Sequence, residues 1–322
     1  MHRRFKDYFF IILKGIAMGA ADVVPGVSGG TIAFISGIYE ELIESIDNLN
    51  FGVFKTWKKE GFKTAWNSIN GTFLLALFSG IAISILSLAK LIKHLLHNEP
   101  ILLWSFFFGL VLASVLYIAK QIKNWSPKII LAIIITSIVS YFITLAEPFA
   151  STDSSMYLLF CGFIAIIAMI LPGVSGAFIL LILGAYETAI NTVNNLIEGL
   201  TTGNFDLFKD ALLKFFLLGI GAVIGLKVFS KLLNWMFKHQ KNLILAILTG
   251  FMIGSLNKIW PWKEILKTRI NSEGIEVTVL DKSILPNAYI GDPQIITAIA
   301  VVGVGFATIL ILEYFGNKKP EA

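Results

Sequence analysis

Val24-Pro25-Gly26-Val27-Ser28-Gly29-Gly30 is the stretch that decides the fold, because it recurs in the second half of the chain as Leu171-Pro172-Gly173-Val174-Ser175-Gly176-Ala177. At the same offset, Gly37-Ile38-Tyr39-Glu40 matches Gly184-Ala185-Tyr186-Glu187. Two matches in register are improbable by chance and indicate a tandem duplication. We therefore expect two repeats, at residues 1–149 and 150–322.

The composition indicates a membrane protein. Of the 322 residues, 56% are hydrophobic and only 15% are charged. Soluble domains carry roughly 25% charged residues, so an ordinary soluble protein is excluded. The charge-free stretches from Phe73 to Ala89, from Ile129 to Ala146 and from Ile295 to Leu312 suit transmembrane helices, which need roughly 17 to 25 apolar residues. The expected fold class is therefore an all-α polytopic membrane protein.

Each repeat is expected to hold a broken pair of apolar segments followed by three transmembrane helices. In the first repeat these are 8–21 with 29–46, then 72–92, 100–120 and 128–146. In the second they are 156–170 with 174–194, then 212–232, 242–260 and 294–315.

The broken pairs should be re-entrant hairpins, at about 8–46 and 156–194. A leading arm of about 14 residues reaches only about 21 Å, whereas the hydrocarbon core is about 30 Å thick. Proline removes a hydrogen-bond donor and glycine frees the backbone, so each helix should break at its Pro-Gly pair. Two full crossings would return the chain to the same side of the membrane as a hairpin does. The choice of a hairpin over two crossings therefore rests on arm length alone.

Three crossings per repeat would make the second repeat inverted. With the N-terminus inside, most of the 26 lysines and arginines fall in segments on the inner side, in keeping with the positive-inside rule. Both termini are therefore expected in the cytoplasm. The polar segment 261–293 then forms an extracytoplasmic cap, in which Ile275 to Val279 is a candidate strand.

An inverted duplication with interrupted helices in matching positions points to a transport site near the bilayer midplane. Each break exposes N–H groups at the start of the next half-helix, where the macrodipole adds positive charge. Two such starts meeting tip to tip suit a phosphate or another anion. The expected binding residues are Pro25, Gly26, Val27, Ser28, Gly29, Thr31, Pro172, Gly173, Val174, Ser175 and Gly176. The alternative is that the breaks are structural kinks with capping serines.

Four charged residues near the breaks are candidates for headgroup attraction, coupling or gating. Asp22 either relays a proton or cation or caps the opposing backbone. Lys14 either attracts an anionic headgroup or snorkels to the inner surface. Glu40 and Glu187 are either alternating gates or proton carriers, or acids in an interface without such a role.

Catalytic, metal and nucleic-acid functions are not indicated. Gly26 to Gly30 fits the G-x-S-x-G pattern of hydrolases, but no strand precedes it and the apolar blocks contain no histidine. The single Cys161 excludes a disulfide framework or a cysteine-based zinc site within one chain. The net charge of +5 comes from lysines spread between apolar blocks, so we expect no nucleic-acid partner and no cofactor.

Three Gly-x-x-x-Gly spacings suit close helix packing, within the chain or between chains. They are Gly15 with Gly19, Gly221 with Gly225, and Gly250 with Gly254. The pattern is too common to predict a dimer.

The segment Ala21 to Thr31, together with Leu171 to Gly176, resembles the DUF368 family of bacterial membrane proteins, the polyprenyl-phosphate translocases. The resemblance covers nearly the whole chain in length and repeat layout. It implies a multi-pass protein of the bacterial cytoplasmic membrane that returns undecaprenyl phosphate to the inner leaflet for reuse in cell-wall synthesis. It also implies that the Pro-Gly-Val-Ser-Gly positions hold the headgroup.

Movement of a substrate against its gradient needs a coupled ion. From the position of Asp22 beside the first break, we expect its carboxylate to carry a proton or another cation. A carrier or channel for a small soluble anion remains an alternative, because it would use the same dipole-lined site. An intramembrane enzyme acting on a lipid phosphate is the third possibility, but no nucleophile, base or metal cluster can be assembled for it.

Overall fold

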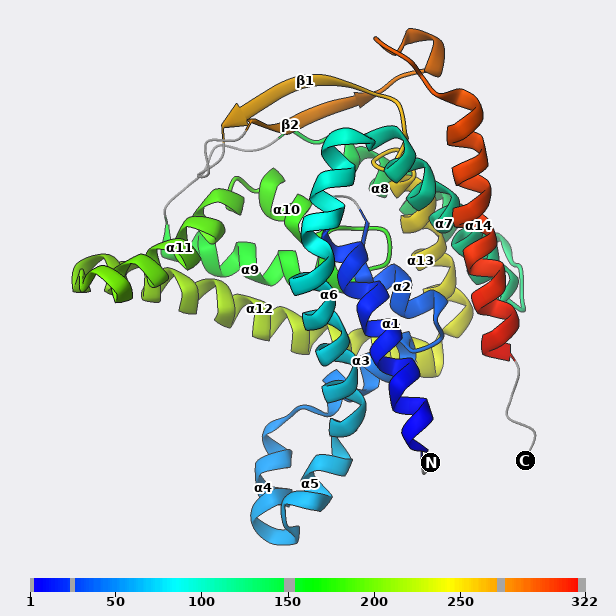
Figure 1. The fold of residues 1–322 in the computed structure, drawn as a ribbon. Helices are drawn as coiled ribbons and strands as arrows, with labels where there is room; N and C mark the ends of the chain where they lie inside the picture. The colour runs from blue at the N-terminus through cyan, green and yellow to red at the C-terminus, as the bar shows by residue number, and fades with distance from the viewer. Residues whose placement is uncertain (1–2, 24–26, 148–153, 271–275, 318–322) are drawn as a thin grey trace.

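The computed structural model describes residues 3–23, 27–147, 154–270 and 276–317, and these are mostly helical (Figure 1). The first half contains α1 (Phe5–Val23), α2 (Gly29–Ile35), α3 (Tyr39–Asn48), α4 (Phe51–Glu60), α5 (Phe62–Ser68), α6 (Gly71–Asn98), α7 (Pro100–Lys120) and α8 (Pro127–Thr144). The second contains α9 (Ser155–Ile170), α10 (Gly176–Ile182), α11 (Tyr186–Thr202), α12 (Phe205–His239), α13 (Lys241–Ser255), β1 (Lys263–Ile270), β2 (Glu276–Ser283), a short 3-10 turn (Pro286–Ala288) and α14 (Ile295–Asn317).

Helix packing repeats between the two halves. The helix before each Pro-Gly break packs along the first long helix of its own half, α1 on α6 and α9 on α12. The last two helices of each half exchange partners, so that α7 packs on α14 and α8 packs on α13. The two halves are therefore interlocked rather than set side by side as separate bundles.

Glycines let the helices of these pairs pack closely against each other. A Cβ atom added at Gly19 of α1 would lie 2.8 Å from the carbonyl oxygen of Ile81 in α6. One added at Gly225 of α12 would lie 2.5 Å from the carbonyl oxygen of Phe163 in α9. Gly254 of α13 approaches α8 in the same way. All three Gly-x-x-x-Gly spacings thus serve packing within the chain, where small residues let helix backbones approach.

The expectation of one continuous second arm in each repeat, over 29–46 and 174–194, is wrong. Gly37 ends α2 with φ of 72° and Gly184 ends α10 with φ of 67°. In each case the residue after the glycine donates its N–H five residues back, from Ile38 to Ala33 and from Ala185 to Leu180. This is the Schellman ending, which glycine favours because it adopts positive φ without steric cost. The chain bends by 107° between α10 and α11.

Helix lengths support several membrane crossings. Among the described residues, α6, α7, α8 and α12 are long and apolar enough to span a membrane. With 35 residues, α12 is longer than the predicted 212–232, whereas α13 has only 15 residues and ends before the predicted 260. The seven-residue helices α2 and α10 reach only about 10 Å each, far less than a bilayer.

Two polar elements lie at opposite ends of the molecule in Figure 1. The cap at 261–293 contains an antiparallel hairpin of β1 and β2. The predicted strand falls within β2 from Glu276 onward, while Ile275 lies outside the described residues. Helices α4 and α5, which were not predicted, lie at the other end, where α1 begins and α14 ends.

Candidate functional site at the junction of the two breaks

The two breaks touch each other. The hydroxyl of Ser28 points to the carbonyl oxygens of Met169, at 3.2 Å, and Leu171, at 3.4 Å. In return, the backbone N–H of Gly173 donates to the hydroxyl oxygen of Thr31 at 3.0 Å. The break after α1 is thus joined by direct hydrogen bonds to the end of α9 and to the break that follows it.

Tyr39 is a member of this junction that the sequence reasoning missed. Its side chain is buried and its hydroxyl donates to the carbonyl oxygen of Ile170 at 3.1 Å. Because α9 ends at Ile170, its last carbonyl groups have no partner within the helix. Hydroxyls from the first half supply those partners. The tyrosine shared by the two Gly-x-Tyr-Glu segments was the available signal.

Protein groups occupy the helix starts that were expected to hold an anion. The N–H of Gly29 donates to the Asp22 carboxylate at 2.6 Å, and the N–H of Gly30 donates to the Ser28 hydroxyl at 3.1 Å. At α10 the N–H of Phe178 donates to the Ser175 hydroxyl at 3.4 Å. Asp22 therefore caps α2 and is the anion nearest its start, which agrees with the capping alternative for this residue.

The junction is closed in this structure. Its described side chains are almost fully buried, with exposed fractions of 1% for Ser28, 0% for Thr31 and 8% for Ser175. The predicted contact residues Val27, Gly29, Pro172, Val174 and Gly176 are buried too. Pro25 and Gly26 lie outside the described residues.

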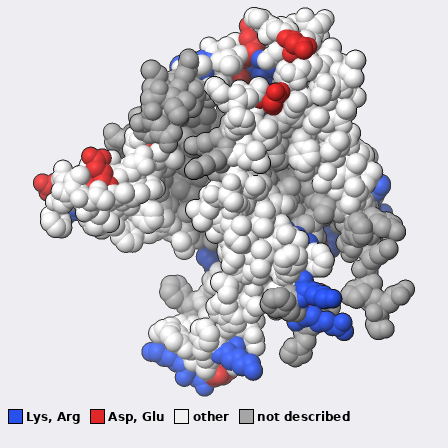
Figure 2. All heavy atoms as spheres, in the orientation of Figure 1, with Lys and Arg blue, Asp and Glu red and all other residues white. Residues whose placement is uncertain are grey.

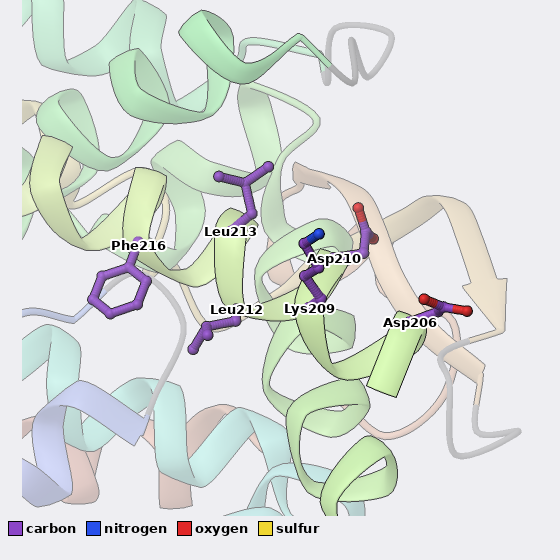
Figure 3. A pocket seen from close by; sticks show the side chains of 6 residues that line it. All are labelled: Asp206, Lys209, Asp210, Leu212, Leu213 and Phe216. Atoms are coloured by element: carbon purple, nitrogen blue, oxygen red, sulfur yellow. The ribbon is translucent and has the colours of Figure 1, made fainter. Parts of the chain in front are cut away.

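A surface pocket of roughly 490 Å³ lies elsewhere, on α12. Figure 3 shows that its six labelled residues all come from this one helix: Asp206, Lys209, Asp210, Leu212, Leu213 and Phe216. Asp210 forms an ion pair with Lys214 one turn later, at 2.9 Å. Because no other helix contributes a described residue to its lining, this surface does not form part of the junction.

Lys14 lies at the other end of α2 from the break. Its ammonium donates to the carbonyl oxygen of Ser36 at 2.6 Å, and Ser36 is the C-cap residue of α2. A cation there satisfies an otherwise unpaired carbonyl and complements the negative end of the helix dipole. Its hydrogen bond is therefore to the end of α2 that lies away from the break.

Glu40 belongs to a set of ion pairs along α3. Its carboxylate is 2.7 Å from the ammonium of Lys241 at the start of α13, and both side chains are half exposed. Further along the helix, Glu41 pairs with Arg3 and Glu44 with Lys238. Glu187 occupies the equivalent place at the start of α11 and is exposed. Neither glutamate lies among the junction contacts described above.

Among the described residues, no cluster of three or more His, Cys, Asp or Glu side chains can hold a metal ion. Cys161 is buried and carries a free thiol. The polar chemistry of the junction therefore consists of hydroxyls, backbone groups and the Asp22 carboxylate.

Comparison with known proteins places the chain in a family. A family model described as "VCA0040-like: Undecaprenyl phosphate translocase-like" matches residues 18–277. The "Polyprenyl-phosphate transporter" of Vibrio cholerae serotype O1 is 43% identical over 316 residues, covering 97% of this chain and 98% of that protein. The protein of the same name from Staphylococcus aureus is 32% identical over 263 residues, covering 78% and 85%. No solved structure matches the chain. The chain belongs to the undecaprenyl phosphate translocase-like family.

Proposed function

We propose that this protein carries undecaprenyl phosphate across the bacterial cytoplasmic membrane, returning the lipid carrier to the inner leaflet for reuse. Family membership and the printed names of two relatives support transport of a polyprenyl phosphate. The observation that carries the proposal is the buried junction, where hydroxyls of the first break bond to the backbone of the second. Such a seam offers polar groups inside an otherwise apolar bundle.

The junction suits the phosphate headgroup of the substrate, which does not cross hydrocarbon unaided. A prenyl tail remains in lipid, but a phosphate loses its hydration in hydrocarbon at high free-energy cost. Ser28 and Tyr39 now donate to carbonyl oxygens, and the same hydroxyls are able to donate to phosphate oxygens. We infer that the headgroup replaces these internal acceptors when the two breaks separate. The Pro-Gly-Val-Ser-Gly residues of both repeats line its path.

Asp22 supplies a means of coupling. Its carboxylate holds the N–H of Gly29, a donor that a phosphate would use. Protonation weakens a carboxylate as an acceptor and removes its repulsion of a phosphate. In the proposed cycle a proton on Asp22 therefore frees the start of α2 for the headgroup. Release of that proton on the other side restores the closed junction.

Ion pairs of α3 are the proposed inner latch. We infer inverted repeats at 1–149 and 150–322 that rock about the junction, as in other transporters built from such repeats. The pair between Glu40 and Lys241 joins the first repeat to the second, so rocking must break it. Glu187 is the proposed counterpart on the outer side, and Lys14 steadies the end of α2 while the break moves.

The proposed orientation has both termini in the cytoplasm and the cap outside. Lysines gather over the α4–α5 end in Figure 2, where Lys55, Lys58, Lys59 and Lys63 are exposed. The positive-inside rule supports placing that end in the cytoplasm.

Reconstituted liposomes test the proposal. Transbilayer movement of undecaprenyl phosphate is measured with the full chain, and release of inorganic phosphate is followed in parallel. Movement without release is expected. Release would make the protein a lipid-phosphate enzyme. Transport of inorganic phosphate with no movement of the lipid would favour the small-anion carrier.

A further inference from the structure

A buried charge cluster beneath the cap plays no part in the function proposed above. The ammonium of Lys258 lies 2.7 Å from one carboxylate oxygen of Asp281, and that of Lys263 lies 3.3 Å from the other. The exposed fractions of these side chains are only 12% for Lys258, 10% for Lys263 and 17% for Asp281. The cluster thus joins the end of α13 to both strands of the cap.

Charge does not balance in this cluster. Two ammonium groups share one carboxylate, and their other described contacts are uncharged. Lys263 donates to the carbonyl oxygen of Lys258 at 2.7 Å and lies 3.8 Å from the ring centroid of Trp104. Lys258 lies 4.6 Å from the ring centroid of Phe178. Burial of an uncompensated charge is costly, so an ion-pair cluster that only held the cap would be better served by one lysine.

The pKa of Lys263 agrees with an excess of positive charge. Burial, together with the positive charge of Lys258, lowers this pKa from 10.5 to about 8 despite the attraction of Asp281. A second anion near the two ammonium groups would oppose both effects.

A pocket of roughly 360 Å³ is lined by residues that are close in sequence to the cluster, although Lys258, Lys263 and Asp281 are not among its lining residues. Its lining is mainly apolar and consists of Phe108, Leu256, Asn257, Trp260, Ser283, Ile284 and Leu285. Asn257 directly precedes Lys258, and Ser283 follows Asp281 by two positions on β2. The Ser283 hydroxyl donates to the carbonyl oxygen of Asn257 at 2.9 Å, which ties the two polar walls together.

The position suits a lipid headgroup. Trp260 and Trp262 contact each other in the segment that links Lys258 to Lys263, and Lys263 contacts the ring of Trp104. Tryptophans concentrate at the level of the headgroups in membrane proteins. Phe178, which Lys258 contacts, is in the first turn of α10, directly after the second break. The cluster is therefore next to the junction, on the end of the molecule opposite α4 and α5 (Figure 1).

We propose that Lys258 and Lys263 form a loading site for an isoprenyl monophosphate, whose phosphate binds the two ammonium groups and whose first isoprenyl units fill the adjacent pocket. Asp281 is the internal counter-ion that neutralises part of the site until the phosphate arrives. The inference rests on the proposed function and names the place where the substrate is held before it reaches the junction.

Binding of farnesyl monophosphate to the purified full chain in detergent tests the site by titration calorimetry. Loss of one charged donor should weaken binding about tenfold or more, so Lys258→Gln and Lys263→Gln are both expected to do so. Asp281→Asn should tighten binding, because it removes the competing anion. Lys282→Gln, at an exposed position on the same hairpin, is the matched control and should bind like the wild type.

Two ligand controls separate the parts of the site. Farnesol lacks the charge and inorganic phosphate lacks the tail, so both are expected to bind much more weakly than farnesyl monophosphate. Equal binding of either ligand would overturn the proposal, as would unchanged affinity in both lysine variants. Lys258→Arg keeps the charge and should retain binding, which distinguishes loss of the site from loss of folding.

Failure of this inference is distinct from failure of the proposed function. Normal binding in the lysine variants, with undecaprenyl phosphate still moved by the wild type, would remove only the loading site. Specific binding at the cluster, with no movement of the lipid by the wild type, would remove only the translocase function.

Discussion

Gly30→Ala probes the contact between the two breaks most sharply. The added Cβ atom would lie 2.6 Å from the carbonyl oxygen of Ile170, well short of the 3.4 Å at which ordinary contact begins. Overpacking of this kind costs about 1–3 kcal/mol. Replacing a helical glycine by alanine returns at most about 1 kcal/mol, and less in the first turn of a helix. We expect a net loss of about 1–2 kcal/mol in the free energy of unfolding.

The assay is unfolding in mixed micelles titrated with sodium dodecyl sulfate, followed by circular dichroism. Gly219→Ala in α12 is the matched control, because a Cβ atom there meets nothing within 4 Å. This control should be neutral or slightly stabilising. Transport by Gly30→Ala should also change, since the breaks are forced apart. Equal stability and transport in the two variants would refute the contact between the breaks.

Three further predictions concern charge. Asp22→Asn should abolish the response of transport to an imposed pH gradient, and an unchanged response in proteoliposomes would exclude Asp22 as the proton carrier. Glu40→Gln should cost less than about 1 kcal/mol in stability, because its pair with Lys241 is half exposed, yet it should alter the transport rate. The depressed pKa of Lys263 means that the folded chain binds fewer protons than the unfolded chain between pH 8 and 10.5. The free energy of unfolding should therefore rise with pH across that window, and in Lys263→Met this rise should be absent.

The duplicated motif was sufficient to predict the breaks and the helices around them. Proline and glycine act locally, so Pro172 and Gly173 mark the end of α9 without knowledge of the fold. The long apolar segments likewise correspond to α6, α7 and α8, because helix length follows from the bilayer. The contact between the two breaks could be predicted only from the duplication. Two repeats with interrupted helices in matching positions are expected to bring those interruptions together.

The second bend in each repeat was missed although its signal was present. Gly37 and Gly184 stand at the same position of the repeat, and glycine is the usual residue at a helix ending with positive φ. An isolated glycine within an apolar run is also tolerated in membrane helices, so its presence alone did not indicate a break.

Partners of charged side chains could not be predicted, because they come from distant parts of the chain. Lys14 binds the end of α2, and Lys258 binds a carboxylate on the second strand of the cap. Helices α4 and α5 were hidden for a different reason. They are short and polar, with apolar side chains such as Trp57 exposed, and they lack the length that identifies a transmembrane helix.

Translocation by the double variant Ser28→Ala with Ser175→Ala is the measurement that bears most directly on passage of the headgroup through the junction. Each lost hydrogen bond to a charged phosphate should slow movement of undecaprenyl phosphate about tenfold or more. Ser126→Ala removes an equivalent helix cap from α8, outside the junction, and should leave the rate unchanged. We expect the double variant to fold and to move the lipid slowly, whereas Ser126→Ala moves it at the wild-type rate. Equal rates in the two proteins would contradict this expectation.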